Sequence, residues 1–523
     1  MEPRIAQDIA DFRKLRINDC IYVDKTAILH ELICAPGRSL YFISRPRRFG
    51  KSLMLSTLEC IFRGQRELFK GLAIDKLDYD WAEYPILHFN FGTMKVESIE
   101  LFTQQFVERV SRSIEAAGGI YNPAVTPDTN FADAIQKLAK DRGKPVVILI
   151  DEYDAPVGAA LNDIAKAKAI RGKLSAFYGE IKNNAANIRF MMMTGVTKFT
   201  QLSVFSALNN LNNLTLDDRY ATLLGYTDDE LTTYFEPAMR RHAEVMGLSY
   251  EAYREKLRWW YNGYRFARWN TTKVYNPCAI GKTLGTCTPE FLGTWTSTGL
   301  TSIVFNYFAN NQLADQDYEH VEDVSEEDLD VGELEKIRPI AMLYQGGYLT
   351  IKDYECGVFT LGIPDEEVRR AFNSQLVQKF AEKEDDRYRN AICRALRQAD
   401  FATFFGKLSD LYAHLTYGSK EGNVQEFSFQ RILYVLLTSS GFFRVTAEDR
   451  QSHGRADLVA ETPERVFIFE LKVDGTPQEA LAQIKEKGYA EPYRHSGKDV
   501  HLIGLSFDGK TRHLTGTAAE PLV

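Results

Sequence analysis

Runs of apolar residues bounded by polar residues or glycine predict three strands in the first part of the chain. They cover residues 39–44 (SLYFIS), 144–156 (KPVVILIDEYDAP) and 188–198 (IRFMMMTGVTK). Continuous runs of aliphatic and β-branched residues are typical of strands buried in a parallel sheet. Residues 52–62 (SLMLSTLECIF) instead carry apolar side chains at helical spacing. The pattern therefore predicts an α/β domain that begins with a strand, a loop and a helix.

The middle of the chain changes between helical and extended patterns. Apolar residues recur every three or four positions over residues 228–260, and the helical pattern returns over residues 365–417. Between these regions, residues 339–351 and 356–364 resemble the two strands of a hairpin. The acidic stretch at residues 318–336 predicts a solvated helix face or a linker.

The last part of the chain has its own pattern of strands and helices. Residues 424–442 predict an amphipathic helix stopped by glycine, and residues 453–475 predict two strands around the turn at residues 461–464. A helix over residues 478–493 and a closing strand over residues 499–507 follow. This order predicts a second, smaller α/β domain.

Composition narrows the class of protein. The 523 residues are 45% hydrophobic and 26% charged, with a formal net charge of −8, so a nucleic-acid partner would have to use a local groove. Seven cysteines without a CxxC pair disfavour a disulfide framework or a zinc site. No apolar run approaches the roughly 18 residues that span a bilayer. We therefore expect a cytoplasmic protein without a membrane partner.

The segment SRPRRFGKSL, residues 44–53, contains the GKS of a phosphate-binding loop between the first predicted strand and helix. Gly50 lets the backbone approach phosphate, Lys51 brings positive charge, and Ser52 offers a hydroxyl to Mg²⁺ at a helix start. Arg45 replaces the first glycine of the generic pattern, and the alternative is a basic loop that contains GKS by chance. The predicted nucleotide-binding residues are Arg45, Pro46, Arg47, Arg48, Phe49, Gly50, Lys51, Ser52, Leu53, Asp151 and Thr194.

Two acids end the second predicted strand, where the carboxyl ends of parallel strands meet. Asp151 is predicted to hold Mg²⁺ with Ser52, and Glu152 to orient the attacking water. An ordinary acidic turn would explain these acids but not their partnership with the GKS loop. Thr194, Thr197 or Lys198 could sense the γ phosphate, although each also suits a turn. Arg219 is a weaker finger candidate, for which a surface salt bridge is the alternative.

The last hundred residues carry a second candidate chemistry. Strand alternation puts Glu470 and Lys472 on one face, and pairing of the two strands brings Asp457 across from them. Asp457, Glu470 and the carbonyl of Leu471 suit Mg²⁺ or Mn²⁺, with Lys472 activating a water for phosphodiester hydrolysis. The alternative is a structural ion pair on an edge strand. Two further candidates lie on helices: Glu426 as a metal ligand, and Gln483 to orient Lys472 or touch a phosphate.

Five motifs occur in chain order: YVDKT (22–26), SRPRRFGKS (44–52), LIDEYD (149–154), SVFSALNNLNNLTL (203–216) and WYNGYRF (260–266). Together they resemble the bacterial AAA-ATPase-like family, whose loop characteristically has the sequence RPRRFGKS. The resemblance covers about the first 300 residues and implies ATP binding and hydrolysis, with Tyr22 and residues 24–26 framing the nucleotide. Members of this family commonly carry a carboxy-terminal nuclease-like domain.

The carboxy-terminal segments RADLV and FELK resemble the PD-(D/E)XK nucleases. Ala456 stands where that family usually has proline, which leaves the acids in place. Gln483 and Tyr489 are similar to the glutamine and tyrosine signature of the exonuclease-like branch but are further apart, which puts the subtype in doubt.

These observations predict an α/β fold with an AAA-like P-loop NTPase parallel sheet, a helical subdomain and a PD-(D/E)XK nuclease-like domain. The expected boundaries are 1–215 for the ATPase core, 216–300 for the helical subdomain, 301–420 for a helical or mixed connecting region and 421–523 for the nuclease-like domain.

The predicted function is ATP binding and hydrolysis coupled to Mg²⁺- or Mn²⁺-dependent cleavage of DNA, in preference to RNA, in a homo-oligomer. The alternative is an ATP-dependent switch or remodelling protein whose nuclease-like domain binds without cutting.

Overall fold

A computed structural model describes residues 4–7, 9–199, 211–291, 293–295, 318–332, 334, 338–380, 386–414, 426–447, 456–511 and 513–522. For residues 377–380, 386–388, 414 and 426–428 it describes the backbone alone. The chain forms two compact units. Unit 1 comprises Met1–Val304 and Tyr318–Glu367, and unit 2 comprises Phe305–Asp317 and Val368–Val523. Each unit is described by itself.

The three predicted strands, β1, β3 and β4, form a parallel sheet with β2 and β5, in the order β2-β3-β4-β1-β5. The sequence pattern did not predict β2 and β5. Every residue of β3 is buried, as the continuous apolar run predicts. The sheet therefore confirms an α/β core with the phosphate loop directly after β1. The strands are β1 (Leu40–Ser44), β2 (Ile86–Asn90), β3 (Val146–Asp151), β4 (Ile188–Gly195) and β5 (Asn212–Asn213).

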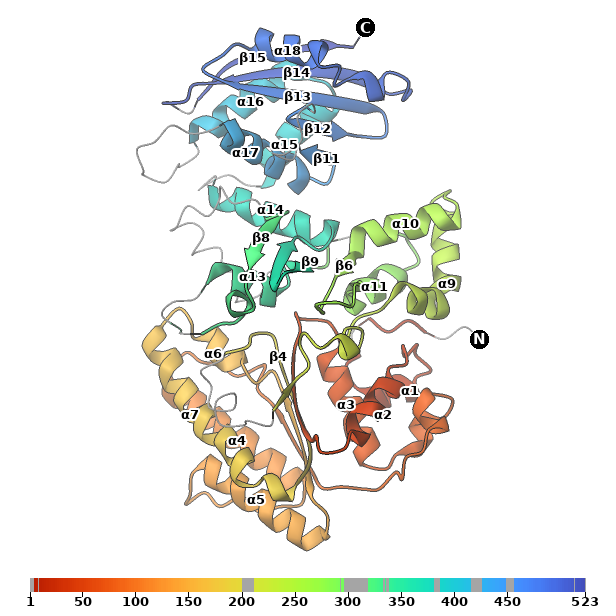
Figure 1. The fold of residues 1–523 in the computed structure, drawn as a ribbon, viewed down its shortest axis with the longest axis vertical. Helices are drawn as coiled ribbons and strands as arrows, with labels where there is room; N and C mark the ends of the chain where they lie inside the picture. The colour runs from red at the N-terminus through yellow and green to blue at the C-terminus, as the bar shows by residue number, and fades with distance from the viewer. Residues whose placement is uncertain are drawn as a thin grey trace. The chain divides into compact units, whose positions relative to one another are not determined.

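Helices cover both faces of this sheet, with α1 to α3 on one side and α4, α5 and α7 on the other (Figure 1). The helix that follows the loop begins at Lys51, because Gly50 adopts a left-handed conformation with φ +91° that ends the loop. These helices are α1 (Phe12–Ile17), α2 (Thr26–Cys34), α3 (Lys51–Phe62), α4 (Ile99–Ala116), α5 (Pro127–Arg142), α6 (Ala155–Ala159) and α7 (Ile164–Asn183).

The predicted helical subdomain contains α9 (Asp228–Val245), α10 (Tyr250–Tyr261) and α11 (Pro277–Leu284). Thr227 and Glu230 form a reciprocal capping box at the start of α9. A short antiparallel ribbon of β6 (Asn262–Tyr264) and β7 (Val274–Tyr275) follows α10. The motif at residues 260–266 therefore begins in a helix and continues into a strand.

Unit 1 also contains an antiparallel sheet in the order β8-β10-β9, where β8 is Val321–Val324, β9 is Thr350–Glu355 and β10 is Val358–Gly362. The predicted hairpin is β9–β10. The first predicted hairpin strand is wrong at its start, because Pro339–Gly346 forms helix α13, with proline in the first turn and left-handed Gly347 at its end.

The acidic stretch is not a solvated helix face or a linker over its described part, so this prediction is wrong. Its Val321 and Val324 are buried while Glu322 and Asp323 are exposed, which is enough for β8 to pair with β10. A short 3-10 helix, Glu326–Leu329, follows with a capping box from Ser325. Charged residues make up most of this segment, but the burial of its two valines favours a strand.

Unit 2 is built on a mixed sheet in the order β11-β12-β13-β14-β15. β13 and β14 are parallel, and the other neighbours are antiparallel. Phe467 and Phe469 face Phe401 and Phe404 of α16, whereas Val466 packs with residues of α18 on the opposite face. The strands are β11 (Arg444–Ala447), β12 (Leu458–Glu461), β13 (Arg465–Val473), β14 (Asp499–Phe507) and β15 (Leu514–Pro521).

The predicted helices of this part are present as α14 (Glu366–Phe380), α15 (Asp386–Arg397), α16 (Phe401–His414), α17 (Glu426–Ser439) and α18 (Pro477–Glu486). Two details differ from the sequence prediction. Helix α18 ends at Glu486 instead of residue 493, with left-handed Gly488 following. The strand β14 does not close the sheet, because β15 pairs antiparallel with it.

Candidate active sites

Lys51 is bound by the phosphate loop's own backbone. Its Nζ donates hydrogen bonds to the carbonyl oxygens of Arg45 at 2.8 Å and Pro46 at 2.9 Å. The side chain is buried, and this burial lowers the pKa of Lys51 to about 8, against the raising effect of Asp151 and Glu152. The ammonium therefore lies within the loop, close enough to Asp151 and Glu152 after β3 for their charges to act on it.

The carboxylate of Asp151 is the meeting point of three strand ends. Its Oδ2 accepts a hydrogen bond from Ser52 Oγ at 2.6 Å, and its Oδ1 accepts one from Thr194 Oγ1 at 2.7 Å. Asn90 Nδ2 lies 3.4 Å from Oδ2. The structure therefore brings together Ser52, Asp151 and Thr194, and this set of hard oxygen atoms fits Mg²⁺.

Glu152 follows with a left-handed backbone, φ +52°. Its carboxylate lies over Gly92, where a Cβ atom would come within 1.7 Å of Glu152 Oε2. Gly92 therefore leaves the space that this acid occupies. The amide of Gly92 also donates to Asn90 Oδ1 at 2.9 Å, which ties the turn after β2 to the same region.

Asp154 joins the turn after β3 to the end of β4. Its buried carboxylate accepts hydrogen bonds from the amides of Val196 at 3.2 Å and Thr197 at 2.6 Å. Burial raises the pKa of Asp154 to about 6, against the lowering effect of these amides and of Lys51. A Cβ atom at Gly195 would lie 2.5 Å from Asp154 Oδ1, so this contact needs the glycine.

Arg45 is a buried anchor of the loop. Its Nη1 donates to the carbonyl oxygens of Ser44 at 2.9 Å and Thr215 at 2.8 Å, and its guanidinium lies 4.2 Å from the ring centre of Phe266. Only 1% of the residue is exposed, and burial lowers the pKa of Arg45 to about 10. The residue that replaces the generic glycine thus ties the loop to the aromatic motif.

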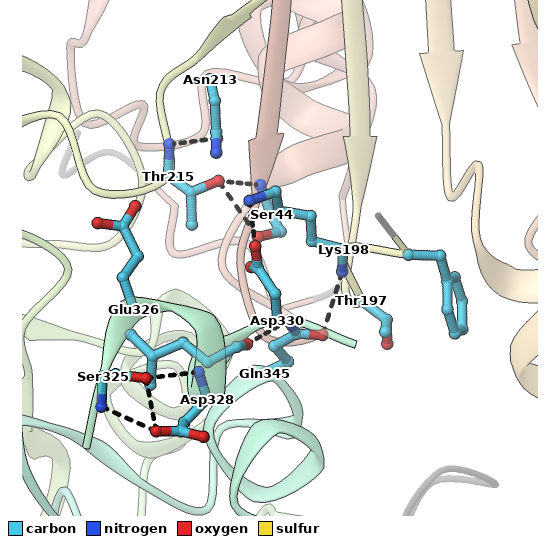
Figure 2. A network of polar contacts seen from close by, with 12 residues as sticks. Ser44, Thr197, Lys198, Asn213, Thr215, Ser325, Glu326, Asp328, Asp330 and Gln345 are labelled. Carbon is cyan, nitrogen blue, oxygen red and sulfur yellow. Dashed lines mark hydrogen bonds and ion pairs between the residues drawn. The ribbon is translucent and has the colours of Figure 1, made fainter. Parts of the chain in front are cut away.

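Lys198 and Arg219, two further polar candidates, have protein partners. Lys198 Nζ forms an ion pair with Asp330 of the acidic stretch, and its amide donates to Gln345 Oε1 at 3.1 Å (Figure 2). Its carbonyl accepts a hydrogen bond from the amide of Val331. Arg219 pairs with Asp217 at the surface, which is the alternative that the sequence left open.

A small, mostly apolar pocket lies beside the loop. Tyr22 and Lys25 line it together with Phe49, Gly50 and Leu53 of the loop region, and residues 223–226 form another wall. Two residues of the YVDKT motif support the fold around this pocket. Asp24 Oδ1 accepts from the Thr26 amide at 2.8 Å, and Asp24 Oδ2 accepts from the Ala73 amide at 2.7 Å.

The second candidate site lies on the β12–β13 pair of unit 2. Leu458 pairs with Phe469 in the antiparallel register, and Asp457 lies in a bend directly before β12. Asp457 Oδ2 accepts a hydrogen bond from the amide of Leu471 at 2.7 Å. Lys472 Nζ lies 3.1 Å from Glu470 Oε1, which places these two side chains on the same face.

The two remaining predicted residues of this site, Glu426 and Gln483, lie on helices α17 and α18. Glu426 begins α17, but its side chain lies outside the described atoms. Gln483 is half-buried on α18. Gln430, one turn after Glu426, donates through Nε2 to the carbonyl of Asp457, a contact that the sequence did not suggest. Within the described residues, no group of three His, Cys, Asp or Glu side chains could hold a metal.

A known protein matches nearly the whole chain. The "Uncharacterized protein in vnfD 5'region" of Azotobacter chroococcum mcd 1 is 33% identical over 527 residues, covering 98% of each chain. The model of the AAA-ATPase-like family, described as Predicted AAA-ATPase, matches residues 7–205, and that of the PD-(D/E)XK nuclease superfamily matches residues 424–516.

The chain belongs to the AAA-ATPase-like family. The matched regions contain the two candidate sites, so both the predicted family and the predicted fold class are confirmed. In the described part of this AAA-ATPase-like protein, no helix has the length and apolar character that crossing a membrane needs.

The structure adds residues that the sequence did not single out in this AAA-ATPase-like protein. Gly92, Asp154 and Gln430 each contact a predicted site residue or its strand. Asp154 is the last residue of the LIDEYD motif, so its position just after the strand could have indicated a role at this site. Residues 203–210 of another quoted motif lie outside the described residues.

Proposed function

We propose that this protein binds and hydrolyses ATP in unit 1 and that this activity is coupled to metal-dependent phosphodiester cleavage of DNA in unit 2. RNA is the less favoured substrate. The observation that carries the first half is the hydrogen bond of 2.6 Å between Ser52 and Asp151, because a phosphate loop joined to a strand-end acid is the arrangement that holds a nucleotide's Mg²⁺.

Each residue around this hydrogen bond has its own role in ATP hydrolysis. Ser52 and Asp151 would hold Mg²⁺, which would neutralise charge on the phosphate oxygens. Lys51 leaves the carbonyls of Arg45 and Pro46 and turns its ammonium to the phosphates, where the α3 N-terminus also favours an anion. Glu152 orients the attacking water, and Thr194 fixes the Asp151 carboxylate.

The proposed nuclease centre uses the acids of β12 and β13. Asp457, Glu470 and the carbonyl of Leu471 would hold Mg²⁺ or Mn²⁺, with Glu426 as a further ligand. Lys472 holds and polarises a water for attack on the phosphodiester, and its ion pair with Glu470 keeps the ammonium at the site. The support is geometric, since Asp457 binds the amide of Leu471, the residue that follows Glu470.

We further propose a cytoplasmic location and self-association. None of the seven cysteines, all within the described residues, forms a disulfide, which suits a reducing compartment. AAA-like ATPases form rings, so a homo-oligomer is the expected assembly. Sedimentation with and without ATP measures this assembly, and a monomer under both conditions overturns it.

The test measures ATP turnover and plasmid nicking in Mg²⁺ or Mn²⁺. Lys51→Ala should abolish turnover, and Glu152→Gln should bind ATP but hydrolyse it slowly. Lys472→Ala should stop nicking, whereas Lys487→Ala, at an exposed lysine of the same unit, should cut like the wild type. If the wild type turns over ATP but cuts under no metal or nucleotide condition, the protein is an ATP-dependent switch instead.

A further inference from the structure

Arg48 of the phosphate loop is linked by polar contacts to the first turn of α14. Arg48 donates to the carbonyl oxygen of Thr294. Glu367 Oε1 accepts hydrogen bonds from Thr294 Oγ1 at 2.7 Å and from the amide of Trp295 at 2.8 Å. Glu367 is 2% exposed, and this burial raises its pKa, against the lowering effects of those donors and of Arg48. A buried carboxylate is costly unless it is bonded in this way.

A second, apolar path leads from the same loop to the same place. The Phe49 ring packs edge-on against Tyr264 at a centroid distance of 4.8 Å and against Phe266 at 5.2 Å. Next to Tyr264, Gly263 lies so close to Pro364 that a Cβ atom would stand 1.8 Å from the Pro364 carbonyl oxygen. The WYNGYRF motif therefore fills the space between the loop and the residues that lead into α14.

Helix α14 contains one of the points at which the chain passes from one unit to the other. It runs over Glu366–Phe380, and the boundary between the units falls after Glu367. Its first residues are thus held by contacts within unit 1, while the remainder of the helix belongs to unit 2. A helix is a stiff element, so a displacement at its first turn is carried along its axis.

We propose that Gly263, Tyr264, Thr294 and Glu367 couple the phosphate loop to α14, so that the nucleotide state of unit 1 reaches the nuclease-like unit. The inference rests on the proposed ATP binding and adds the residues that transmit it. In this structure Lys51 is bonded to the Arg45 and Pro46 carbonyls. A loop that releases Lys51 to phosphate repositions Arg48 and Phe49, and close-packed neighbours cannot absorb that shift.

The first test follows amide hydrogen exchange at residues 368–376 of α14, with and without Mg²⁺ and a non-hydrolysable ATP analogue. In the wild type we expect the analogue to change exchange by about fivefold or more, the lower end of allosteric coupling factors. Gly263→Ala forces the start of α14 away from the motif and should remove this response. Gly172→Ala is the matched control, because no atom lies within 4 Å of the added Cβ.

A second pair of variants keeps the test decisive if Gly263→Ala does not fold. Glu367→Gln keeps the acceptor atom but removes its charge, so the response should weaken, and Glu367→Ala should abolish it. Glu355→Gln, at an exposed glutamate of β9, should respond like the wild type. Nucleotide-dependent cleavage should follow the same order, with the ratio of rates with and without ATP falling towards one.

Direct titration of ATP separates the two possible failures. If the wild type does not bind ATP, the proposed function itself is wrong. If it binds ATP and Lys51→Ala does not, yet exchange in α14 is unchanged by the analogue or still responds in Glu367→Ala, the coupling inference is overturned and the ATPase stands.

Discussion

Ser52 donates its hydroxyl hydrogen to Asp151 over 2.6 Å, although 99 positions of sequence separate the two residues. The contact joins the start of α3 to the end of β3, and Thr194 of β4 binds the other oxygen of the same carboxylate. Three strand or helix ends therefore meet at one acid. This meeting point explains why the chain needs the loop, the acidic strand end and the polar end of β4 together.

Removal of the Ser52 hydroxyl should weaken the Mg²⁺-dependent reaction more than nucleotide binding. We expect Ser52→Ala to lower ATP turnover by about tenfold or more, because one hard ligand and the hydrogen bond to Asp151 are lost. Phosphate release measured across a Mg²⁺ titration should show a higher Mg²⁺ requirement. Ser111→Ala on α4 is the control, and an unchanged Mg²⁺ requirement in Ser52→Ala would refute the role of the hydroxyl.

Gly92 should be needed for the position of Glu152. A Cβ atom at residue 92 would overlap the Glu152 carboxylate, so Gly92→Ala should displace the acid and lower kcat while ATP binding persists. Steady-state turnover and equilibrium binding of ATP measure the two effects separately. Gly179→Ala, with no atom within 4 Å of the new Cβ, should leave both unchanged. Equal kcat in the two variants would contradict the assignment.

Asp154 should give the stability of unit 1 a specific pH dependence. Burial raises its pKa from 3.8 to about 6, so the folded protein binds more protons than the unfolded chain between these values. Stability from this group is therefore present below about pH 4 and is lost as pH rises through 6. The loss amounts to roughly 3 kcal/mol at most.

Unfolding midpoints of the wild type and Asp154→Asn measured from pH 4 to pH 7 check this sign. Relative to the variant, the wild type should lose stability up to about pH 6 and then stay level. A difference between the two proteins that does not vary with pH would show that Asp154 keeps its ordinary pKa.

The ion pair of Lys198 with Asp330 should hold the acidic stretch on the end of β4. Asp330→Asn leaves the Lys198 ammonium without its carboxylate partner. The amide of Val331, which donates to the Lys198 carbonyl, should then exchange its hydrogen about tenfold faster. This change corresponds to about 1.4 kcal/mol in the free energy of local opening. The exchanged pair Lys198→Asp with Asp330→Lys should recover part of the protection. Glu251→Gln, in an exposed pair with Arg254, is the control. Unchanged protection in Asp330→Asn would mean that β8 pairing alone holds the segment.

Local patterns predicted most of the elements because burial and backbone geometry act over short distances. The apolar runs at β1, β3 and β4 and the alternation around Glu470 required no knowledge of distant residues. The pairing of β12 with β13 likewise followed from two extended segments around one turn. These predictions depend on neighbours that the sequence itself places side by side.

The contacts that sequence reasoning missed all depend on the tertiary fold. Nothing near Asp330 indicates Lys198 as its partner, because 132 positions separate them. The burial of Tyr264 against Phe49 likewise joins two motifs that are far apart in the chain. The predicted elements inside residues 318–346 were wrong for two reasons. The acidic residues around Val321 and Val324 obscured a strand pattern, and the apolar run after residue 338 forms a helix that begins at a proline.

The central claim is that one chain holds two separate cation sites, one at the phosphate loop and one between the acids of β12 and β13. Mn²⁺ binding measured by electron paramagnetic resonance, with a non-hydrolysable ATP analogue present, tests it most directly. The wild type should bind two ions. Asp151→Asn should lose one of them, Asp457→Asn should lose the other, and the double variant should bind neither. If Asp457→Asn binds as many ions as the wild type, the account of unit 2 as a metal-dependent nuclease is contradicted.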